Sequence, residues 1–416
     1  MVQQLIHERE GVQRSAIAEV SSKWANRQTI AGPYITVPYD RIFRTYNKET
    51  EKTDVTRTRN YAYFLPEELK INGEIIPEKR YRGIYEVVVY ESKLALNGRF
   101  NPPTFEQIDA EAEKEIFWDK ATLNLGISDL RGIEQQISLQ WNDAEVFFNP
   151  GTSTKDIVNS GINAEIGVRD DEQTSYTFAL QIDLKGSQHL YFTPVGKTTD
   201  VVITSNWNTP SFTGNFLPDE REISETGFSA NWNILHLNRN YPQVWKGNTH
   251  GVRGSEFGTN LLLPVDNYKK SYRVARYSVL FITLTFMVFF FVEVLNKVFI
   301  HPIQYLLVGV ALVVFFSLLL AFSEHMVFNL AYVVAALLTL ILVTLYTTTI
   351  LKSRQLGLLI CGILLVLYGF IFTIIQLEDY ALLIGSIGVF VILAIVMYFS
   401  RKIDWYNIRI GEESNP

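Results

Sequence analysis

Long apolar runs fill the last third of the chain, whereas charged residues lie almost entirely before about residue 276. A bilayer core about 30 Å thick needs roughly 20 apolar residues in a helix. Backbone groups in lipid must form their hydrogen bonds internally, which favours helices. We therefore predict five membrane-spanning helices in the region 273–400, at 274–295, 303–322, 326–347, 356–376 and 380–399.

The polar breaks between these runs alternate in charge. The second and fourth breaks are acidic, at 323–325 and 378–379. The first, third and fifth are basic and contain Lys297, His301, Lys352, Arg354, Arg401, Lys402 and Arg409. By the positive-inside rule, the basic breaks and the tail 401–416 are predicted to be cytoplasmic and residues 1–272 periplasmic. Four basic residues at 269–276 oppose this orientation, but local charge constrains a long translocated domain less.

Four polar residues near the ends of these runs are candidates for function: Glu293, His301, Glu324 and His325. Glu293 follows Tyr277 by 16 residues, about 24 Å along a helix, which places it near an interface. We expect Lys297 to pair with Glu293 at i+4, and Glu324 to lie at the start of its helix, where negative charge complements the helix dipole. A structural role is therefore favoured over an ion pathway.

The region before residue 273 has a different pattern. Residues 4–26 place apolar side chains at helical spacing, so residues 1–26 are predicted to form an amphipathic juxtamembrane helix. Residues 27–272 are predicted to form a β-rich, sandwich-like periplasmic domain of antiparallel strands, with a turn at 185–187 and a polar excursion at 101–120. The clearest strand patterns lie at 34–39, 84–92, 176–184, 188–196, 199–207 and 226–235. The fold class is thus an α+β membrane protein, with a β-rich extracytoplasmic domain followed by a bundle of transmembrane helices.

Composition and motifs restrict the chemistry. The net charge of −6 and the lack of a basic stripe argue against nucleic-acid binding. Cys361 is the only cysteine, which excludes an intrachain disulfide. His7-Glu8 starts like a zinc motif but lacks a second histidine at i+4, and His189, His236 and His250 have no ligand-like spacing. We predict no catalytic residue, metal site or cofactor.

The segment 203–245 is unusually rich in aromatic and polar residues. Trp207 and Trp232, with Arg221 between them, could stack on sugar rings and bond to hydroxyl groups, which would make a glycan-binding surface. The alternative is that these aromatics fill the core and that 219–222 is a solvated turn. We favour the core interpretation.

Three stretches resemble the CreD family of bacterial inner-membrane proteins: 5-LIHERE-10 with 23-KWANRQTIAGPYITVPY-39, then 212–245, and 301–332. The resemblance covers essentially the whole chain. It implies a large extracytoplasmic domain, a multi-spanning C-terminal bundle and a role in envelope homeostasis or stress response. It implies no catalytic residue. Members usually begin with an additional membrane helix before the LIHERE-type segment, and we expect an apolar segment of about 20 residues upstream of Met1 to start translocation.

The sequence therefore favours a non-enzymatic inner-membrane protein of envelope integrity or the envelope stress response. Its expected partners are the lipid bilayer and envelope glycans or other envelope proteins. One alternative is a transporter or channel that uses Glu293, Glu324 or His325 in its bundle. Another is a periplasmic glycan-binding or hydrolytic domain, which would require a convergent site in the β-rich region.

Overall fold

The chain forms two compact units in the computed structural model. The structure describes residues 2–47, 52–106, 108–110, 112–168, 175–261, 267–377, 380–401 and 403. The β unit consists of residues 14–264, and the membrane unit of residues 1–13 together with 265–416. Helix α1 (Val2–Trp24) contains the division, so it contributes residues to both units. The predicted acidic loop at 378–379 and most of the predicted tail lie outside the described residues.

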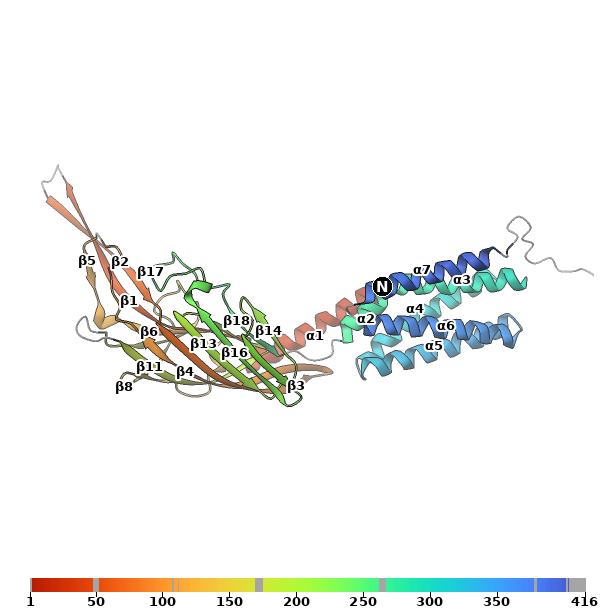
Figure 1. Ribbon diagram of the computed structural model, residues 1–416, viewed down its shortest axis with the longest axis horizontal. Helices are drawn as coiled ribbons and strands as arrows, with labels where there is room; N and C mark the ends of the chain where they lie inside the picture. Colours follow the sequence, from red (N-terminus) through yellow and green to blue (C-terminus); the bar gives the residue numbers. More distant parts are fainter. Residues whose placement is uncertain are drawn as a thin grey trace, which may run out of the picture. The chain divides into compact units, whose positions relative to one another are not determined.

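Two mixed sheets make up the β unit (Figure 1). The first runs in the order β14-β18-β12-β1-β6-β10-β9, with β2 and β5 also paired to β1 and β17 paired to β2. Its strands are β1 (Gln28–Asn47), β2 (Lys52–Phe64), β5 (Lys114–Ile116), β6 (Thr122–Ile127), β9 (Asn149–Pro150), β10 (Gly161–Glu165), β12 (His189–Thr193), β14 (Pro210–Gly214), β17 (Val244–Lys246) and β18 (Phe257–Leu261).

The second sheet runs in the order β15-β16-β13-β3-β4-β11-β7-β8. Its strands are β3 (Glu68–Arg82), β4 (Tyr85–Phe100), β7 (Ser138–Trp141), β8 (Ala144–Phe147), β11 (Tyr176–Ser187), β13 (Thr198–Ser205), β15 (Glu220–Ser224) and β16 (Gly227–Leu235). Three short 3-10 helices, η1 (Trp118–Lys120), η2 (Leu130–Gly132) and η3 (His236–Asn238), lie in the described loops.

The two sheets bury one shared core. In β11 the side chains alternate between buried and exposed, so that Phe178 and Ile182 point inward and Gln181 points outward. This period of two is the one that a half-buried strand requires. Tyr34 of β1 and Tyr90 of β4 belong to the same apolar cluster although they lie in different sheets. The alternating sequence pattern thus predicted the elements because each strand buries one face.

The six predicted strands are all present, but two details of the prediction are wrong. The sheets are not purely antiparallel, since β1 pairs with β12 and β3 pairs with β13 in parallel. Residues 185–187 do not form a turn, because they continue β11 and pair with Glu91, Tyr90 and Val89 of β4. Gly186 is needed there for close packing: a Cβ atom added to it would lie 2.3 Å from the Tyr90 hydroxyl oxygen. The chain turns one residue later, at Gln188 (φ 64°), and enters the other sheet.

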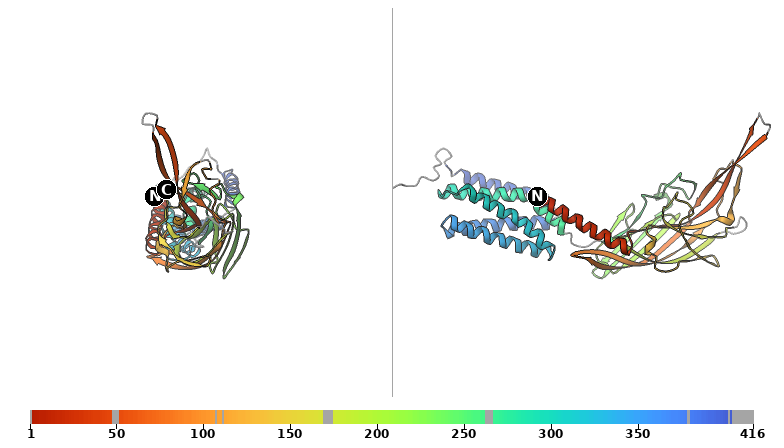
Figure 2. Two further views of the ribbon diagram at one scale, coloured as in Figure 1. Left: turned by 90° about the vertical axis from the view of Figure 1, so that its left-hand side faces the viewer. Right: turned by 180° about the vertical axis from the view of Figure 1, so that it is seen from behind.

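The C-terminal part of the membrane unit contains helices of transmembrane length (Figures 1 and 2). They are α3 (Ser278–Asn296), α4 (Pro302–Ser323), α5 (Phe328–Ile350), α6 (Arg354–Gln376) and α7 (Ala381–Ser400), preceded by the polar helix α2 (Asn267–Arg276). The five predicted spans are therefore confirmed as helices, but the first begins later than residue 274. The helix breaks at Tyr277, between the basic α2 and the apolar run that starts at Ser278.

Aromatic side chains fill the interior of the bundle. Phe281, Phe315 and Tyr368 lie within 4.7 to 6.4 Å of one another between ring centroids, and Tyr332 joins them by donating its hydroxyl to the Tyr368 carbonyl oxygen over 2.8 Å. The outward surfaces are apolar as well. Since lipid tails are as apolar as these side chains, such exposure suits a bundle in a membrane.

Candidate functional site

Glu293 stabilises the α3–α4 hairpin at one end of the bundle. Its carboxylate accepts a hydrogen bond from the Tyr305 hydroxyl over 2.6 Å and one from the Ile300 backbone N–H over 3.2 Å. The side chain is buried, with 8% exposure. The predicted ion pair with Lys297 is wrong: Lys297 is the C-cap of α3 in the left-handed conformation (φ 54°), and Glu293 bonds to the incoming α4 segment instead.

His301 caps the start of α4. Its imidazole accepts from the Ile303 N–H over 3.3 Å, and the Gln304 side chain in turn accepts from the His301 N–H over 3.0 Å. Pro302 follows at the first helical position, where the absence of an N–H has no cost. His301 is thus a local capping residue, as expected for a tight connection between helices.

Glu324 lies at the opposite end of α4 and joins three segments of the membrane unit. It accepts a hydrogen bond from the Tyr268 hydroxyl of α2 over 2.9 Å, and the Arg9 guanidinium of α1 lies 3.6 Å away. The expected position at the start of a helix is wrong, because Glu324 is the C-cap of α4 and α5 begins at Phe328. Its negative charge is therefore stabilised by Arg9 and not by a helix dipole.

The structure does not bring the candidate residues of the bundle together. Glu293 and Tyr305 lie near the start of α4, whereas Glu324 and the exposed His325 follow its end. The 22 residues of α4 correspond to about 33 Å. Aromatic side chains of the interior, among them Phe315, lie between the two ends, and the buried hydroxyl groups of Thr285 and Thr339 donate to carbonyl oxygens of their own helices.

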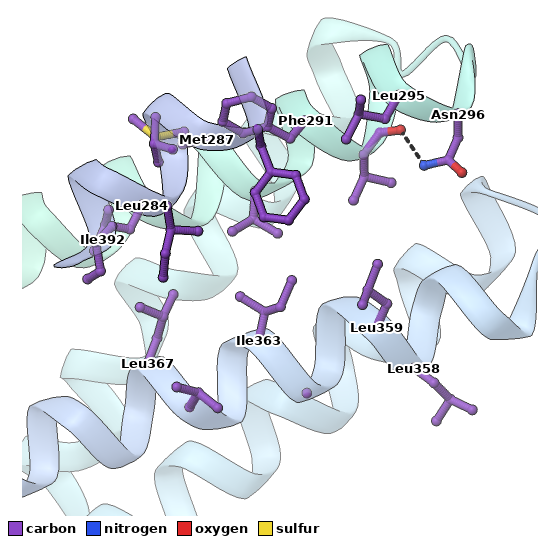
Figure 3. A pocket seen from close by; sticks show the side chains of 17 residues that line it. Leu284, Met287, Phe291, Leu295, Asn296, Leu358, Leu359, Ile363, Leu367 and Ile392 are labelled. Carbon is purple, nitrogen blue, oxygen red and sulfur yellow. Dashed lines mark hydrogen bonds between the residues drawn. The ribbon is translucent and has the colours of Figure 1, made fainter. Parts of the chain in front are cut away.

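A groove of about 800 Å³ lies between α3, α6 and α7 (Figure 3). Leucine, isoleucine, valine, phenylalanine and methionine side chains point into it, among them Met287, Phe291 and Ile363. The only polar residue in its lining is Asn296, whose amide donates to the Val292 carbonyl oxygen over 2.9 Å, as the dashed line shows. Such a lining suits lipid chains and offers no hydrated path.

The aromatic residues of the segment 203–245 belong mainly to the core of the β unit. Trp232 is fully buried, and Trp207 is half-buried against the same cluster. Trp232 therefore cannot stack on a sugar, which removes the most apolar part of the proposed glycan surface. Arg221 is exposed on β15, an edge strand whose residues all face solvent. The solvated turn expected at 219–222 is thus largely an exposed strand.

One cleft in the β unit contains residues that the sequence analysis did not select. It has a volume of about 300 Å³ and lies where the segments after β14, after η3 and before β18 meet. Its lining residues are Asn215, Phe216, Leu237, Asn238, Arg239, Asn240, Tyr241, Gly251, Arg253, Gly254 and Ser255. Among these lining residues, Arg239 is both charged and buried. The sequence signal was the cluster 238-NRNY-241, but nothing local indicates that its arginine points inward.

Possible metal ligands do not gather within the described part of the chain, where no group of three or more histidine, cysteine, aspartate or glutamate residues could hold an ion.

Apolar helices of spanning length, attached to a unit of two mixed sheets, define a multi-pass membrane protein. The family model described as inner membrane protein CreD matches residues 1–406. The chain is 32% identical over 409 residues to the inner membrane protein CreD of Escherichia coli (strain K12), across 98% of this chain and 89% of that protein. This chain belongs to the CreD family and is a multi-pass inner-membrane protein.

Solved structures with partial similarity include two forms of an M1 zinc metallopeptidase from Deinococcus radiodurans, one of them bound to a Tyr-Ser-Ala substrate. They are 11% and 9% identical to this chain, with TM-scores of 0.20 and 0.19. Each match covers 41% of this chain, and 39% and 38% of the respective metallopeptidase chains. These low TM-scores carry no functional information.

Proposed function

We propose that this protein acts without enzymatic activity in cell-envelope integrity or the envelope stress response, with the bundle as its anchor and the β unit as its periplasmic working part. The observation that carries this proposal is the separation of Glu293 and Glu324 by the length of α4, with aromatic side chains between them. A transporter needs polar groups near the middle of the bilayer. Here the carboxylates of Glu293 and Glu324 each accept a hydrogen bond that joins helices at one end of the bundle.

The orientation rests on the charges of the described loops. Lys297 and His301 lie in the α3–α4 connection, and Lys352 and Arg354 lie in the connection between α5 and α6. Both connections are at the same end of an alternating bundle, and the positive-inside rule assigns that end to the cytoplasm. Residues 14–264 then face the periplasm, which suits a domain that contacts envelope components.

The role in the envelope is supported by the family of the chain and by the form of the β unit. The unit presents strands and loops around one apolar core, and the lining of its cleft at Arg239 contains no carboxylate or histidine that could act as a general acid or base beside Ser255. A binding or load-bearing module fits such a surface better than a hydrolase does. Contacts with glycans would then involve exposed polar residues and not Trp232.

Two experiments test the proposal. Reporter fusions in the 323–325 loop should read as periplasmic and fusions after Arg409 as cytoplasmic. The inverse pattern would contradict the orientation.

A deletion strain tests the role of the protein. It should become more sensitive to detergents and to cell-wall antibiotics, and both the original chain and Glu324→Gln should restore resistance. If Glu293→Gln and Glu324→Gln each abolish complementation while inserting normally, transport through the bundle becomes the better explanation. An unchanged phenotype in the deletion strain would contradict the envelope role.

A further inference from the structure

Arg239 carries a buried positive charge that only neutral groups contact. Its Nη1 donates to the Tyr241 carbonyl oxygen over 2.6 Å, and its Nη2 lies 3.3 and 3.4 Å from the carbonyl oxygens of Val195 and Gly196. The Nη2 atom also donates to the Gln243 side-chain oxygen. None of these acceptors is charged, and none of the described carboxylates forms an ion pair with Arg239.

The guanidinium group remains protonated at neutral pH although it is buried. Burial lowers the pKa of Arg239 to about 10, which is still well above 7. The guanidinium lies 4.2 Å from the centre of the Tyr241 ring, an arrangement that further favours the cation. Its Nε atom is buried and has no hydrogen-bond partner. A buried charge is costly unless it is paired, so this arginine lacks the counter-charge that such a position normally requires.

The surroundings of Arg239 add positive charge and hydrogen-bond donors. Arg253 also lines the cleft, is exposed, and forms no ion pair with any described residue. Burial and, to a smaller degree, the nearby Glu256 carboxylate raise the pKa of Tyr241, and this carboxylate accepts a hydrogen bond from the Gly254 N–H over 2.8 Å. Two arginines against this one glutamate leave the cleft with a net positive charge.

Amide side chains complete the polar lining. The Asn238 side-chain oxygen accepts from the Leu235 N–H over 3.0 Å, which leaves its NH₂ group to face other acceptors. Asn240 is exposed at the edge of the cleft, and the Asn215 amide donates to the Gly254 carbonyl oxygen. Phe216 and Leu237 supply apolar surface on the rim, where Leu237 is 79% exposed.

We propose that this cleft binds a small organic oxyanion, a ligand that presents a carboxylate or a phosphate group to Arg253 and to the field of Arg239. Guanidinium groups recognise both of these anions through charge-assisted hydrogen bonds. A volume of about 300 Å³ accommodates a group the size of one sugar residue. The asparagine amides and the Leu237 surface would contact the remainder of the ligand. This inference goes beyond the proposed function and does not depend on the side of the membrane that the β unit occupies.

The test uses the full chain in a neutral detergent at constant ionic strength, because surface charges are screened by salt. Isothermal titration calorimetry compares three probes: N-acetylmuramic acid, which carries a carboxylate, N-acetylglucosamine, its neutral counterpart, and inorganic phosphate. We expect saturable binding of N-acetylmuramic acid or phosphate at one site and none of N-acetylglucosamine. Binding of the acidic sugar alone would identify a carboxylate ligand, and binding of phosphate alone a phosphate ligand.

Matched variants of two arginines distinguish binding in this cleft from a general effect of surface charge. Arg253→Gln should weaken binding at least about fivefold, and Arg253→Glu should abolish it, because an anion would face a carboxylate. Arg221→Gln and Arg221→Glu change another exposed arginine, which lies outside the cleft, and should alter the affinity less than about twofold. Arg253 and Arg221 are both exposed, so these variants are expected to keep the native melting temperature.

Three results would overturn the proposal. The first is the absence of saturable binding of either anion at millimolar concentrations. The second is equal binding of N-acetylglucosamine, and the third is equal weakening by the Arg253 and Arg221 variants. None of these results would alter the reporter-fusion pattern or the deletion phenotype, so failure of this site and failure of the proposed function are distinguishable.

Discussion

The β unit and the bundle treat large apolar side chains in opposite ways. Trp232 in the β unit is fully buried, whereas Phe390 on α7 is 71% exposed in the bundle. In water such an exposed ring would be unfavourable, but lipid tails offer it an equally apolar environment. Stability in the β unit therefore depends on filling a core, while the bundle depends more on contacts between specific helices.

The largest effect that tests this contrast is expected for Trp232→Ala. The change leaves a cavity beside Phe212 and Phe257, whose ring centroids lie 5.7 and 5.6 Å from that of Trp232. Large-to-small substitutions of this kind cost about 3–5 kcal/mol. Pulse proteolysis of the β unit in urea should show a much lower midpoint. Phe390→Ala is the matched control, and a loss of similar size there would contradict the contrast.

Gly186→Ala tests how tightly β11 packs against Tyr90 of the neighbouring strand β4, where the predicted turn proved to be strand. The new methyl group would meet the Tyr90 ring, so we expect a cost of about 2 kcal/mol from overpacking. Gly11→Ala is the control within α1, because no atom lies within 4 Å of its added Cβ. That change should stabilise the helix by up to about 1 kcal/mol. Equal melting temperatures for the two variants would argue against close packing at Gly186.

Tyr305→Phe removes a hydrogen bond that joins α4 to the buried Glu293 carboxylate. Because that bond is charge-assisted, we expect a loss of about 1.5 kcal/mol, measured by thermal denaturation in detergent. Tyr380→Phe, at an exposed position, should change the melting temperature little.

Glu293→Gln retains an oxygen that can accept one of the two hydrogen bonds, so it should keep envelope function with a smaller loss of stability. Loss of function without loss of insertion would point to an ion pathway.

The smallest effect concerns Asp129, which caps η2 in the β unit. Its carboxylate accepts a hydrogen bond from the Asn26 N–H over 2.9 Å and forms an ion pair with the Arg131 guanidinium at 2.6 Å. The hydrogen bond from Arg131 contributes most to lowering the pKa of Asp129 to about 2. A carboxyl group with an unfolded pKa near 3.9 then stabilises the fold above about pH 4 and loses this effect as the pH falls toward 2.

Asp129→Asn should cost about 1 kcal/mol at pH 7 and flatten the pH dependence of the melting temperature between pH 4 and 2. Asp143→Asn changes an exposed turn residue and serves as the control. An unaltered slope in the Asp129 variant would show that this carboxylate does not contribute to acid sensitivity.

The sequence by itself determined the spanning helices, the N-terminal helix and six of the eighteen described strands. Apolar runs of about 20 residues were sufficient to place the spanning helices, because lipid requires every backbone group to be bonded within its own helix. The alternation of apolar and polar residues was sufficient to locate strands such as β11 and β16, because each of these strands buries one face. The position of Pro302 in the first turn of α4 is also a local property, because a residue without an N–H loses no hydrogen bond there.

Only the tertiary structure decided which elements and side chains meet. Nothing near residue 185 reveals that β11 continues to Ser187 and that β12 enters the other sheet, since strand partners are chosen by the packing of the whole core. Glu293 and Glu324 were expected to interact along their own helices, yet their partners Tyr305, Tyr268 and Arg9 come from other helices. Arg239 is one arginine in a polar stretch, and its burial in a cleft with Arg253 depends on three chain segments that only folding brings together. A local pattern fixes which face of an element is buried, but the identity of the neighbour depends on contacts between residues far apart in the chain.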